Sequence, residues 1–566
     1  MDIRAAFNKD GFSVVNEITL EKGSRGFLAE SNTAFNHGTS KKKTAMYVEG
    51  SAYEMGFLIG ALVENQVAQM TGKFADTILI DFIDPNLPDW IKDPLGTILK
   101  DLVEDYSKCV LPTIPDVYKL EMQGIEAGCK HVNPKTTVTY DDLLALNTGF
   151  DVVCAWAYAP DSYWDEALQN MKDRKLVDNF FEFKRIYLSI PIMCNGFSVF
   201  GSGTTTGKHY MGRDFQFPTA EVFQNVATMI IYNPNDGRLP LVSTSAPGFV
   251  GSMVSMNVNG IAAGVDMAPA GPNNPKQPGF NSLLLVRDAI HQGDSAKTAA
   301  DTMIAAQRGV TWAYIIADGT NDRSVVVEAG KSTEDIDPLS YPPEDLSALL
   351  PSQAFLDEHA PDAGQNGVVL RWNDYQYPEV FLQFNKNLFK YFNKLFNPDA
   401  WGKLGFIDES YKDTNAPEFY YFCPQREMFN ELLILTNQFT TPRMRLCQMS
   451  PWSSLISIKY WNDVPWRYDA LNYILQTEFG TIDADVAWRS INFLSPTIGK
   501  YPDYYVYHKS PVITYIGPDG KKHTTIEVHG STSLCNLSDK TMKSLYGYFA
   551  DSAIEITLLN YISGNG

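Results

Sequence analysis

The spacing of apolar residues changes at Cys194, and this change constrains the fold more than any other feature of the chain. From Met46 to about Leu188, apolar side chains mostly recur at helical intervals, as in YVEGSAYEMGFLIGALVENQVAQM. From Cys194 onward the pattern is typical of short strands joined by Gly, Asn and Asp turns, beginning with CNGFSVFGSGTTTGKHYMGRDFQF. Helical blocks between antiparallel strands predict an α+β fold in which helices cover the outside of two sheets.

The first 45 residues differ from the helical region that follows them. Their pattern is mixed and rich in turn formers, and they contain the basic run Lys41-Lys42-Lys43. Because a short run of like charges is usually a solvated face, we expect this run to be an exposed loop.

The charge balance argues against two classes of partner. The 566 residues include 66 acidic and 46 basic side chains, a net charge of −20, so we expect no nucleic acid or anionic membrane as a main partner. No apolar run approaches the ~18 residues of a membrane span, and the sequence as given begins without an apolar signal segment. The compartment stays open, and so does the oligomeric state, with a homo-oligomer as one alternative.

The cysteines and histidines predict neither a disulfide framework nor a metal site. The seven cysteines are odd in number and widely spaced, and no CxxC or Cys/His group has the spacing of a zinc site. The eight histidines contain no HExxH motif. We expect no metal and no other cofactor.

Cys194 itself has two interpretations. It stands at the junction between the helical region and the β region, and a strand follows it at once. A free cysteine in such a place is most often a small buried hydrophobic residue. The alternative is a nucleophile that becomes the first residue of a processed chain.

Four blocks of sequence favour the second interpretation. The helical region has GSAYEMGFLIG at 50–60, and then LEMQGIEAGC at 120–129 with DDLLALN at 141–147. The β region has CNGFSVFGSGTTTGKHYMGRDFQF at 194–217 and NVNGIAAGVDM at 257–267. In this order and spacing, from about residue 46 to the end, the chain resembles the acyl-coenzyme A:6-aminopenicillanic acid acyltransferase family of N-terminal nucleophile (Ntn) hydrolases.

The resemblance implies a fold, a processing step and a reaction. The fold would be a four-layer αββα sandwich, with 194–566 as the catalytic domain and 1–193 as a mainly helical leader. The chain would cut itself between Met193 and Cys194, and the leader would stay bound as a subunit. The thiol of Cys194 would then attack a small-molecule N-acyl amide or other acyl donor, with its own α-amino group as the base. An α-amine has an ordinary pKa of ~7.7–8, so no histidine is needed.

The resemblance also implies supporting residues near the nucleophile. Arg213 matches the family's arginine in G-R-N, and its positive charge would favour the thiolate. The family's aspartate three residues later is Gln216 here, so its electrostatic role is lost or passes to Asp214. Asp266 stands where relatives often have asparagine. Because an ionised carboxylate only accepts hydrogen bonds, Asp266 would hold an amine rather than an oxyanion.

Two further candidates lie later in the chain. Asn373, in VVLRWNDYQYP, lies about where the family has the asparagine of its oxyanion hole. Arg467 resembles the arginine that precedes the family's late helix pair, although Arg443 and Arg445 compete for that role.

Two other functions remain open at this stage. The departures at Gln216 and Asp266 leave room for an unprocessed, non-catalytic binding protein with an inert Cys194. The same fold could also belong to a hydrolase of lipid amides or esters of the Ntn type.

Overall fold

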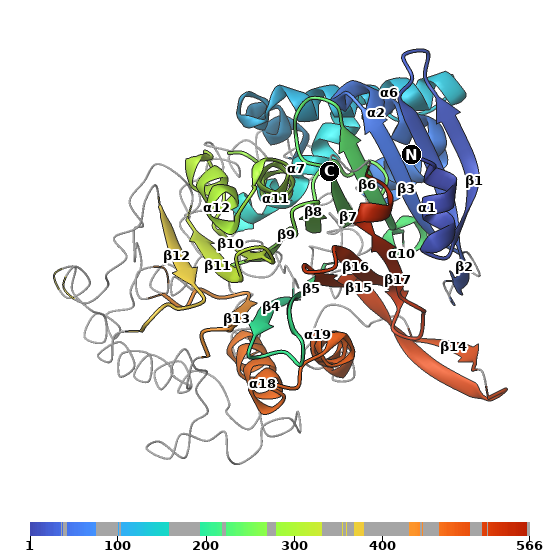
Figure 1. Ribbon diagram of the computed structural model, residues 1–566. Coiled ribbons are helices and arrows are strands. Elements are labelled where there is room, and N and C mark those ends of the chain that lie inside the picture. Colours follow the sequence, from blue (N-terminus) through green and yellow to red (C-terminus); the bar gives the residue numbers. More distant parts are fainter. Residues whose placement is uncertain are drawn as a thin grey trace, which may run out of the picture.

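The structure is a computed structural model of the chain. It describes a few single residues, such as His37 and Met444, and the ranges 1–35, 42–74, 103–157, 193–217, 222–268, 279–330, 367–377, 429–441, 463–498 and 512–562 without 518. The part of the expected helical region from 158 to Leu188 lies outside these residues, as do Arg443 and Arg445. Within them the fold is α+β with two sheets (Figure 1).

The larger sheet is mixed. It has ten strands in the order β1-β2-β3-β6-β7-β8-β9-β10-β11-β12. Neighbours are antiparallel except β3 and β6, which run parallel. The strands are β1 (Phe12–Thr19), β2 (Arg25–Phe35), β3 (Lys42–Gly50), β6 (Thr228–Pro234), β7 (Leu241–Ser245), β8 (Val254–Asn257), β9 (Ile261–Met267), β10 (Trp312–Asp318), β11 (Arg323–Ala329) and β12 (Val368–Trp372).

The smaller sheet carries Cys194. Its seven strands are antiparallel in the order β13-β4-β5-β15-β16-β17, with β14 paired to β15. The strands are β4 (Met193–Gly201), β5 (Gly207–Gln216), β13 (Leu432–Thr436), β14 (Val512–Ile516), β15 (Lys522–Asn536), β16 (Thr541–Tyr548) and β17 (Ile554–Thr557).

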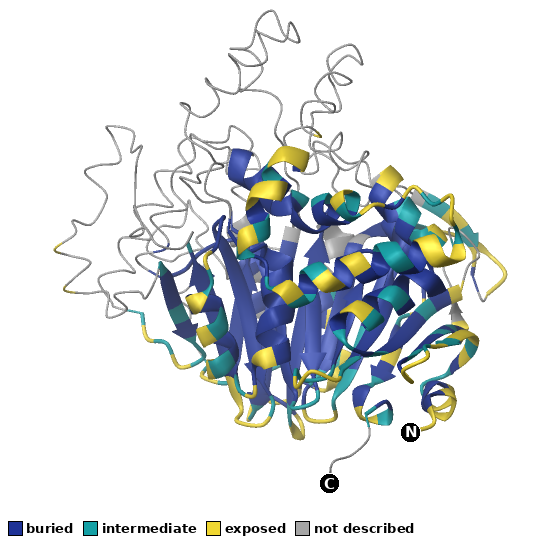
Figure 2. Ribbon diagram, turned by 90° about the horizontal axis from the view of Figure 1, so that it is seen from above, coloured by how far each residue is buried: buried dark blue, intermediate teal, exposed yellow. Residues whose placement is uncertain are grey.

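Helices flank the two sheets (Figure 1). In Figure 2 the longer helices over the larger sheet are buried on one side and exposed on the other, because one face of each packs on the strands. The pair α18 and α19 packs on the smaller sheet. The helices are α1 (Ile3–Lys9), α2 (Ala52–Leu62), α3 (Glu64–Gln69), α6 (Asp116–Val132), α7 (Tyr140–Ala157), α10 (Phe223–Val226), α11 (Ser282–Gln292), α12 (Ala296–Ala305), α18 (Asp463–Thr477) and α19 (Ala484–Ile498), with short π or 3-10 turns at Met70–Phe74, Leu111–Thr113 and Leu558–Asn560.

The segment before Cys194 contributes strands to the larger sheet and does not form a separate unit. Its first fifty residues, whose sequence pattern is mixed and rich in turn formers, form helix α1 and strands β1, β2 and β3. The expectation of a solvated Lys41-Lys42-Lys43 loop is wrong at Lys43, whose side chain is buried. Its ammonium lies 2.8 Å from Oδ2 of Asp551, because β3 runs beside β6 and faces the C-terminal strands.

Helices α2 and α6 cross at unusually close range. A Cβ atom on Gly60 would come 2.2 Å from the carbonyl oxygen of Ile125, and one on Gly124 would come 2.2 Å from that of Tyr53. Only glycine allows the two backbones this approach. Gly56 and Gly60 of the block at 50–60, and Gly124 and Gly128 of the block at 120–129, therefore serve packing between these helices.

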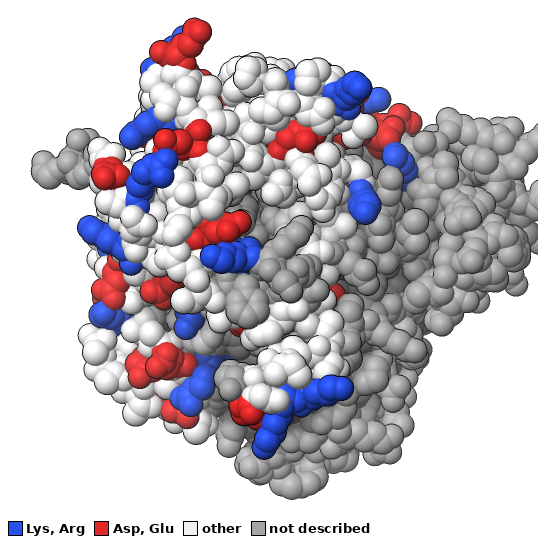
Figure 3. Space-filling model, turned by 90° about the vertical axis from the view of Figure 1, so that its right-hand side faces the viewer, with Lys and Arg blue, Asp and Glu red and all other residues white. Residues whose placement is uncertain are grey.

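The surface gives little sign of a dominant charge on the face seen in Figure 3, where basic and acidic side chains are interspersed. Among the described residues, no helix combines the length and apolar character needed to cross a membrane.

Candidate functional site

Strand β4 places the Cys194 side chain in the space between the two sheets. In the antiparallel pairing of β4 and β5, Cys194 lies opposite Phe215 and Gly196 lies opposite Arg213. Directly opposed residues share a face of a sheet, and so do residues two apart in a strand. Cys194 and Arg213 therefore point to the same side, toward the larger sheet, and both side chains are fully buried.

An ion pair from the larger sheet faces this side of β4. Nη2 of Arg213 lies 2.6 Å from Oδ1 of Asp266 in β9, and both side chains have no exposed area. Gly264, two residues before Asp266, makes room for the arginine, because a Cβ there would come 2.8 Å from its Cδ and Nε atoms. Part of the glycine pattern in the block at 257–267 thus serves the Arg213 side chain.

The side chain of a second arginine, Arg467, contacts the main chain of Cys194. Asn195 and Asp214 point to the opposite face of the smaller sheet, where Asn195 Nδ2 donates to Asp214 Oδ2 at 3.0 Å. Arg467, from α18, donates from Nη1 to the Cys194 carbonyl oxygen at 2.8 Å and to Asn195 Oδ1 at 2.7 Å. Arg467 is fully buried. The Asp214 carboxylate is thus bonded to the residue that follows Cys194, on the face opposite the thiol.

Asn437 completes the contacts around the Cys194 backbone. Its Oδ1 atom accepts the Cys194 amide N–H at 2.7 Å and a second hydrogen bond from Arg467 Nη2 at 3.0 Å. Its Nδ2 atom donates to the Met267 carbonyl oxygen at 2.7 Å. Because only an oxygen can accept from both donors, these contacts fix which way the side-chain amide points.

The electrostatic setting holds the thiol protonated while it is buried in the intact chain. Burial raises the pKa of Cys194 to about 11, the Arg213 cation works against this, and the Asp266 carboxylate adds to it. Burial also raises the pKa of Asp266 to about 6, with the Arg213 cation opposing the rise. Near neutral pH, the site therefore contains a neutral thiol beside an arginine and a carboxyl group that titrates close to neutrality.

Most of the residues singled out from the sequence meet at this place, in different roles. Arg213 and Asp266 lie on the thiol side, and Asp214 and Arg467 lie on the other side of the strand. Gln216 contributes its main-chain carbonyl oxygen, which lies 3.9 Å from the Cys194 Sγ atom. Its side chain lies on the same face as Asp214, away from the thiol.

The expected position of Asn373 is wrong. This residue follows β12, accepts the Ser324 amide N–H at 3.0 Å and donates to the Asn430 carbonyl oxygen at 2.7 Å. Ser324 Oγ bonds to Ser198, which lies four residues along β4 from Cys194, roughly 13 Å away at the usual rise of a strand. Asn437 is the asparagine that reaches Cys194, and the Thr436-Asn437 pair after the apolar run LLIL was its signal in the sequence.

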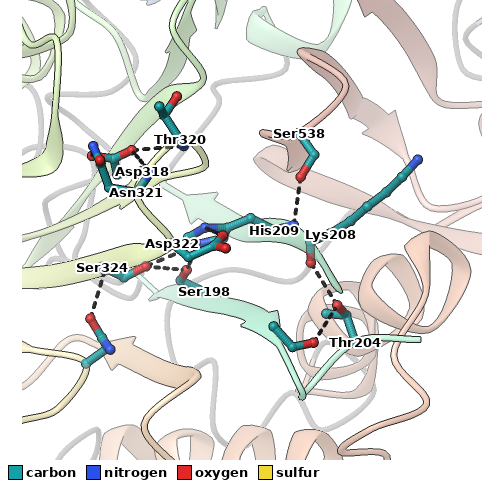
Figure 4. A network of polar contacts seen from close by, with 12 residues as sticks. Ser198, Thr204, Lys208, His209, Asp318, Thr320, Asn321, Asp322, Ser324 and Ser538 are labelled. Atoms are coloured by element: carbon teal, nitrogen blue, oxygen red, sulfur yellow. Dashed lines mark hydrogen bonds and ion pairs between the residues drawn. The ribbon is translucent and has the colours of Figure 1, made fainter. Parts of the chain in front are cut away.

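A second polar cluster lies where Asn373 does, and it contains a serine, a histidine and an aspartate (Figure 4). Ser198 Oγ lies 2.6 Å from Nε2 of His209, and His209 Nδ1 lies 3.5 Å from Oδ1 of Asp322. Ser198 also bonds to Ser324 at 2.6 Å, and Ser198, His209 and Ser324 have no exposed area. Burial lowers the pKa of His209. The cluster satisfies buried hydroxyl groups between the sheets, and its 3.5 Å contact is too long for a bond that fixes a catalytic histidine.

Within the described ranges, no group of three or more His, Cys, Asp or Glu residues could hold a metal ion.

No family model matches the chain. An uncharacterized protein of Archaeoglobus fulgidus is 28% identical over 544 residues, which cover 96% of this chain and 68% of that protein.

Among solved structures, the chain is similar to a Caenorhabditis elegans ortholog of N-acylethanolamine-hydrolyzing acid amidase, with 12% identity, 24% of this chain, 58% of that chain and a TM-score of 0.20. The match thus spans less than two thirds of that amidase. Two variants of a conjugated bile acid hydrolase from Clostridium perfringens match with 10% and 11% identity, 64% and 66% of this chain, 92% and 95% of theirs, and TM-scores of 0.29 and 0.31. Similarity of this size establishes no shared activity.

Proposed function

We propose that this chain is a self-processing N-terminal cysteine hydrolase or acyltransferase that acts on an N-acyl amide through a Cys194 thioester. Its fold would be a four-layer αββα sandwich of the Ntn type, with the leader 1–193 and the catalytic domain 194–566 interleaved in one sheet.

One observation carries the proposal. The Cys194 backbone is held on both sides of its α-carbon, by Asn437 at the amide nitrogen and by Arg467 at the carbonyl oxygen. Its thiol lies on the face that also carries Arg213. A cysteine that served only as a small buried hydrophobic residue would need no such polar setting, because buried charges are costly without a partner.

The two chemical steps would use the same groups. In self-processing, Sγ attacks the Met193 carbonyl carbon, and the C–N bond to Cys194 breaks as the thiol proton passes to the nitrogen, which frees the α-amine. Water then hydrolyses the resulting thioester, which releases the Met193 carboxylate and restores the thiol. In turnover, the thiol proton passes to that amine, Sγ attacks the substrate carbonyl, and the amine returns the proton to the leaving nitrogen. Water or another amine then takes the acyl group from sulfur.

The neighbouring groups would adjust the amine and the thiolate. The Arg467 cation beside the Cys194 backbone would disfavour a protonated α-amine, which keeps the base neutral. Asn437 would hold that amine through the contact that now holds the amide, and Arg213 would favour the thiolate.

The leader would remain bound after cleavage because many contacts cross the cut. Strand β3 pairs with β6 from Thr44 to Gly50, and the leader's Glu121 lies 2.7 Å from Arg287 in a fully buried ion pair. Helix α7 of the leader also borders the site, where Cys154 Sγ lies 3.3 Å from the Met267 sulfur. Such a leader separates only on unfolding.

The test compares the intact masses of the wild-type protein and Cys194→Ala. We expect two wild-type fragments that meet between Met193 and Cys194, co-elute in native buffer and separate in guanidinium chloride. The Cys194→Ala chain should stay whole. A cleaved mutant would contradict the mechanism, and an uncut wild type without thiol-dependent turnover would favour the unprocessed binding protein.

The lipid amide or ester hydrolase remains a second candidate because aromatic rings line the neighbourhood of the site. Phe217, which follows β5, lies against Phe150 and Phe215 with ring centroids 5.4 and 5.3 Å apart. Turnover of acyl aminocoumarins with increasing chain length separates this candidate from an amidase of short acyl groups.

A further inference from the structure

A buried carboxylate in the larger sheet reaches across to the segment that carries Asn437. Glu328, in β11, has no exposed side-chain area. Its Oε1 atom accepts the Thr440 amide N–H at 2.9 Å and the Thr440 hydroxyl at 3.1 Å, and its Oε2 atom accepts the corresponding groups of Thr441 at 3.1 and 2.6 Å. Four hydrogen bonds thus fix two residues that follow Asn437 closely in the chain.

Arg371 adds a contact to the strand that precedes Asn437, and we call the Glu328 and Arg371 contacts together the clamp. Its Nε atom lies 3.3 Å from Glu328 Oε1, and its Nη2 atom donates to the Ile434 carbonyl oxygen at 2.7 Å. Ile434 lies in β13, three residues before Asn437. The Glu328–Arg371 pair therefore holds the chain on both sides of Asn437 from a different sheet.

The pairing register explains how the larger sheet can do this. Glu328 lies opposite Ala313 in β10, and Ala313 lies opposite Asp266 in β9. All three residues therefore share the face of the larger sheet that meets the smaller sheet. Asp266 faces Arg213 beside the thiol, and Glu328 faces the turn that carries Asn437.

We propose that Glu328, with Arg371, is a positioning residue that sets the Asn437 side chain against the Cys194 nitrogen. The expected effect of Glu328 on turnover rests on the function proposed above. Its expected effect on the Cys194 amide rests on geometry alone. Asn437 makes contacts at 2.7 to 3.0 Å with Cys194, Arg467 and Met267, and such contacts lose strength quickly when the donor or acceptor shifts. A free carboxylate can accept from all four Thr440 and Thr441 donors, whereas a glutamine amide nitrogen cannot accept.

The substitution Glu328→Gln therefore tests the clamp, and Glu121→Gln is its matched control. Glu121 and Arg287 also form an ion pair with no exposed area, at 2.7 Å, but this pair lies between α6 and α11. Both substitutions remove one buried charge from an arginine–glutamate pair. Only the first should disturb Asn437.

The first readout does not require activity. In a Cys194→Ala chain, residue 194 keeps its amide N–H and no self-cleavage can remove it. We expect Glu328→Gln to speed hydrogen exchange of that amide roughly tenfold, the size of one weakened hydrogen bond. Glu121→Gln should leave it unchanged. Equal exchange in the two variants would overturn the positioning role.

The second readout is turnover of an N-acyl aminocoumarin by the Cys194 chain. Glu328→Gln should lower kcat with little change in KM, and it should cause no further loss when Asn437→Ala is already present. Equal fold losses in both backgrounds would overturn the proposal, because Glu328 would then act independently of Asn437. If exchange responds to Glu328→Gln but no chain shows thiol-dependent turnover, the positioning role stands and the proposed function fails.

Discussion

The amide nitrogen of Cys194 donates a 2.7 Å hydrogen bond to Oδ1 of Asn437, a residue 243 positions further along the chain. The pairing of β4 with β13 creates this contact, because Asn195 lies opposite Thr436 and brings the next residue level with Cys194. The backbone of a potential nucleophile is thus held by a side chain and not by a ladder bond alone. The consequences can be tested residue by residue.

Replacing Asn437 by alanine should slow both self-cleavage and turnover. The change leaves the Cys194 N–H and Arg467 without their shared acceptor and removes the donor to the Met267 carbonyl oxygen. Loss of a comparable polar group in an active site costs ~10²-fold in rate. The uncut fraction by intact mass, together with kcat on an N-acyl aminocoumarin, measures the effect.

Asn373→Ala is the matched control for that experiment. Asn373 bonds to Ser324 and Asn430, and Ser324 contacts β4 at Ser198, four residues along the strand from Cys194. We expect this variant to lose about 1 kcal/mol of stability and to keep its rate. A rate loss equal to that of Asn437→Ala would return Asn373 to the site.

Asn373 and Asn437 show which features of the site a single sequence can predict. The strand that begins at Cys194 and the G-R motif at Arg213 are local patterns, so the sequence could indicate both. The Thr436-Asn437 pair after an apolar run is a local signal, but which asparagine reaches Cys194 depends on the register of β13 against β4, which pairs segments more than 200 residues apart. The burial of Lys43 was missed for the same reason, because its partner Asp551 lies in the C-terminal part of the chain.

The charges beside the thiol should move its pKa in opposite directions. Arg213 stabilises the thiolate, so Arg213→Met should raise the pKa of Cys194 and shift its alkylation profile to higher pH. Asp266 disfavours the thiolate, so Asp266→Asn should shift the profile to lower pH. The rate of iodoacetamide labelling against pH, read by mass spectrometry of the Cys194 peptide, measures both shifts.

An internal reference accompanies the alkylation experiment. Cys109 is exposed, so its labelling should follow the same profile in every variant. Because a broken buried ion pair can cost ~3–5 kcal/mol, unfolding would expose Cys194 and erase the difference between the two variants. Shifts in the same direction would show that the ion pair acts by holding the structure and not through charge.

The Ser198–His209 contact supports an alternative nucleophile that mutation can exclude. If the cluster in Figure 4 only satisfies buried hydroxyl groups, Ser198→Ala should keep turnover within about twofold, because the buried-group cost falls on stability. Cys194→Ala should abolish turnover in the same assay. Loss of turnover in Ser198→Ala, in a chain that unfolds at the wild-type temperature, would assign the chemistry to the serine.

Substitution of a glycine between α2 and α6 by alanine should cost far more stability than the same substitution at a glycine in a looser helix contact. A Cβ on Gly60 would come 2.2 Å from a carbonyl oxygen of α6, so Gly60→Ala must push the helices apart and should cost about 1–3 kcal/mol or more. Gly149, in α7, has its nearest neighbour, a Val103 methyl group, at 3.4 Å, so Gly149→Ala should be neutral or stabilising, since alanine favours helix. Urea unfolding of each variant measures the difference. A stable Gly60→Ala protein would contradict the close crossing. Because α2 and α6 both lie before Cys194, an unstable one would show that packing within this segment supports the whole chain.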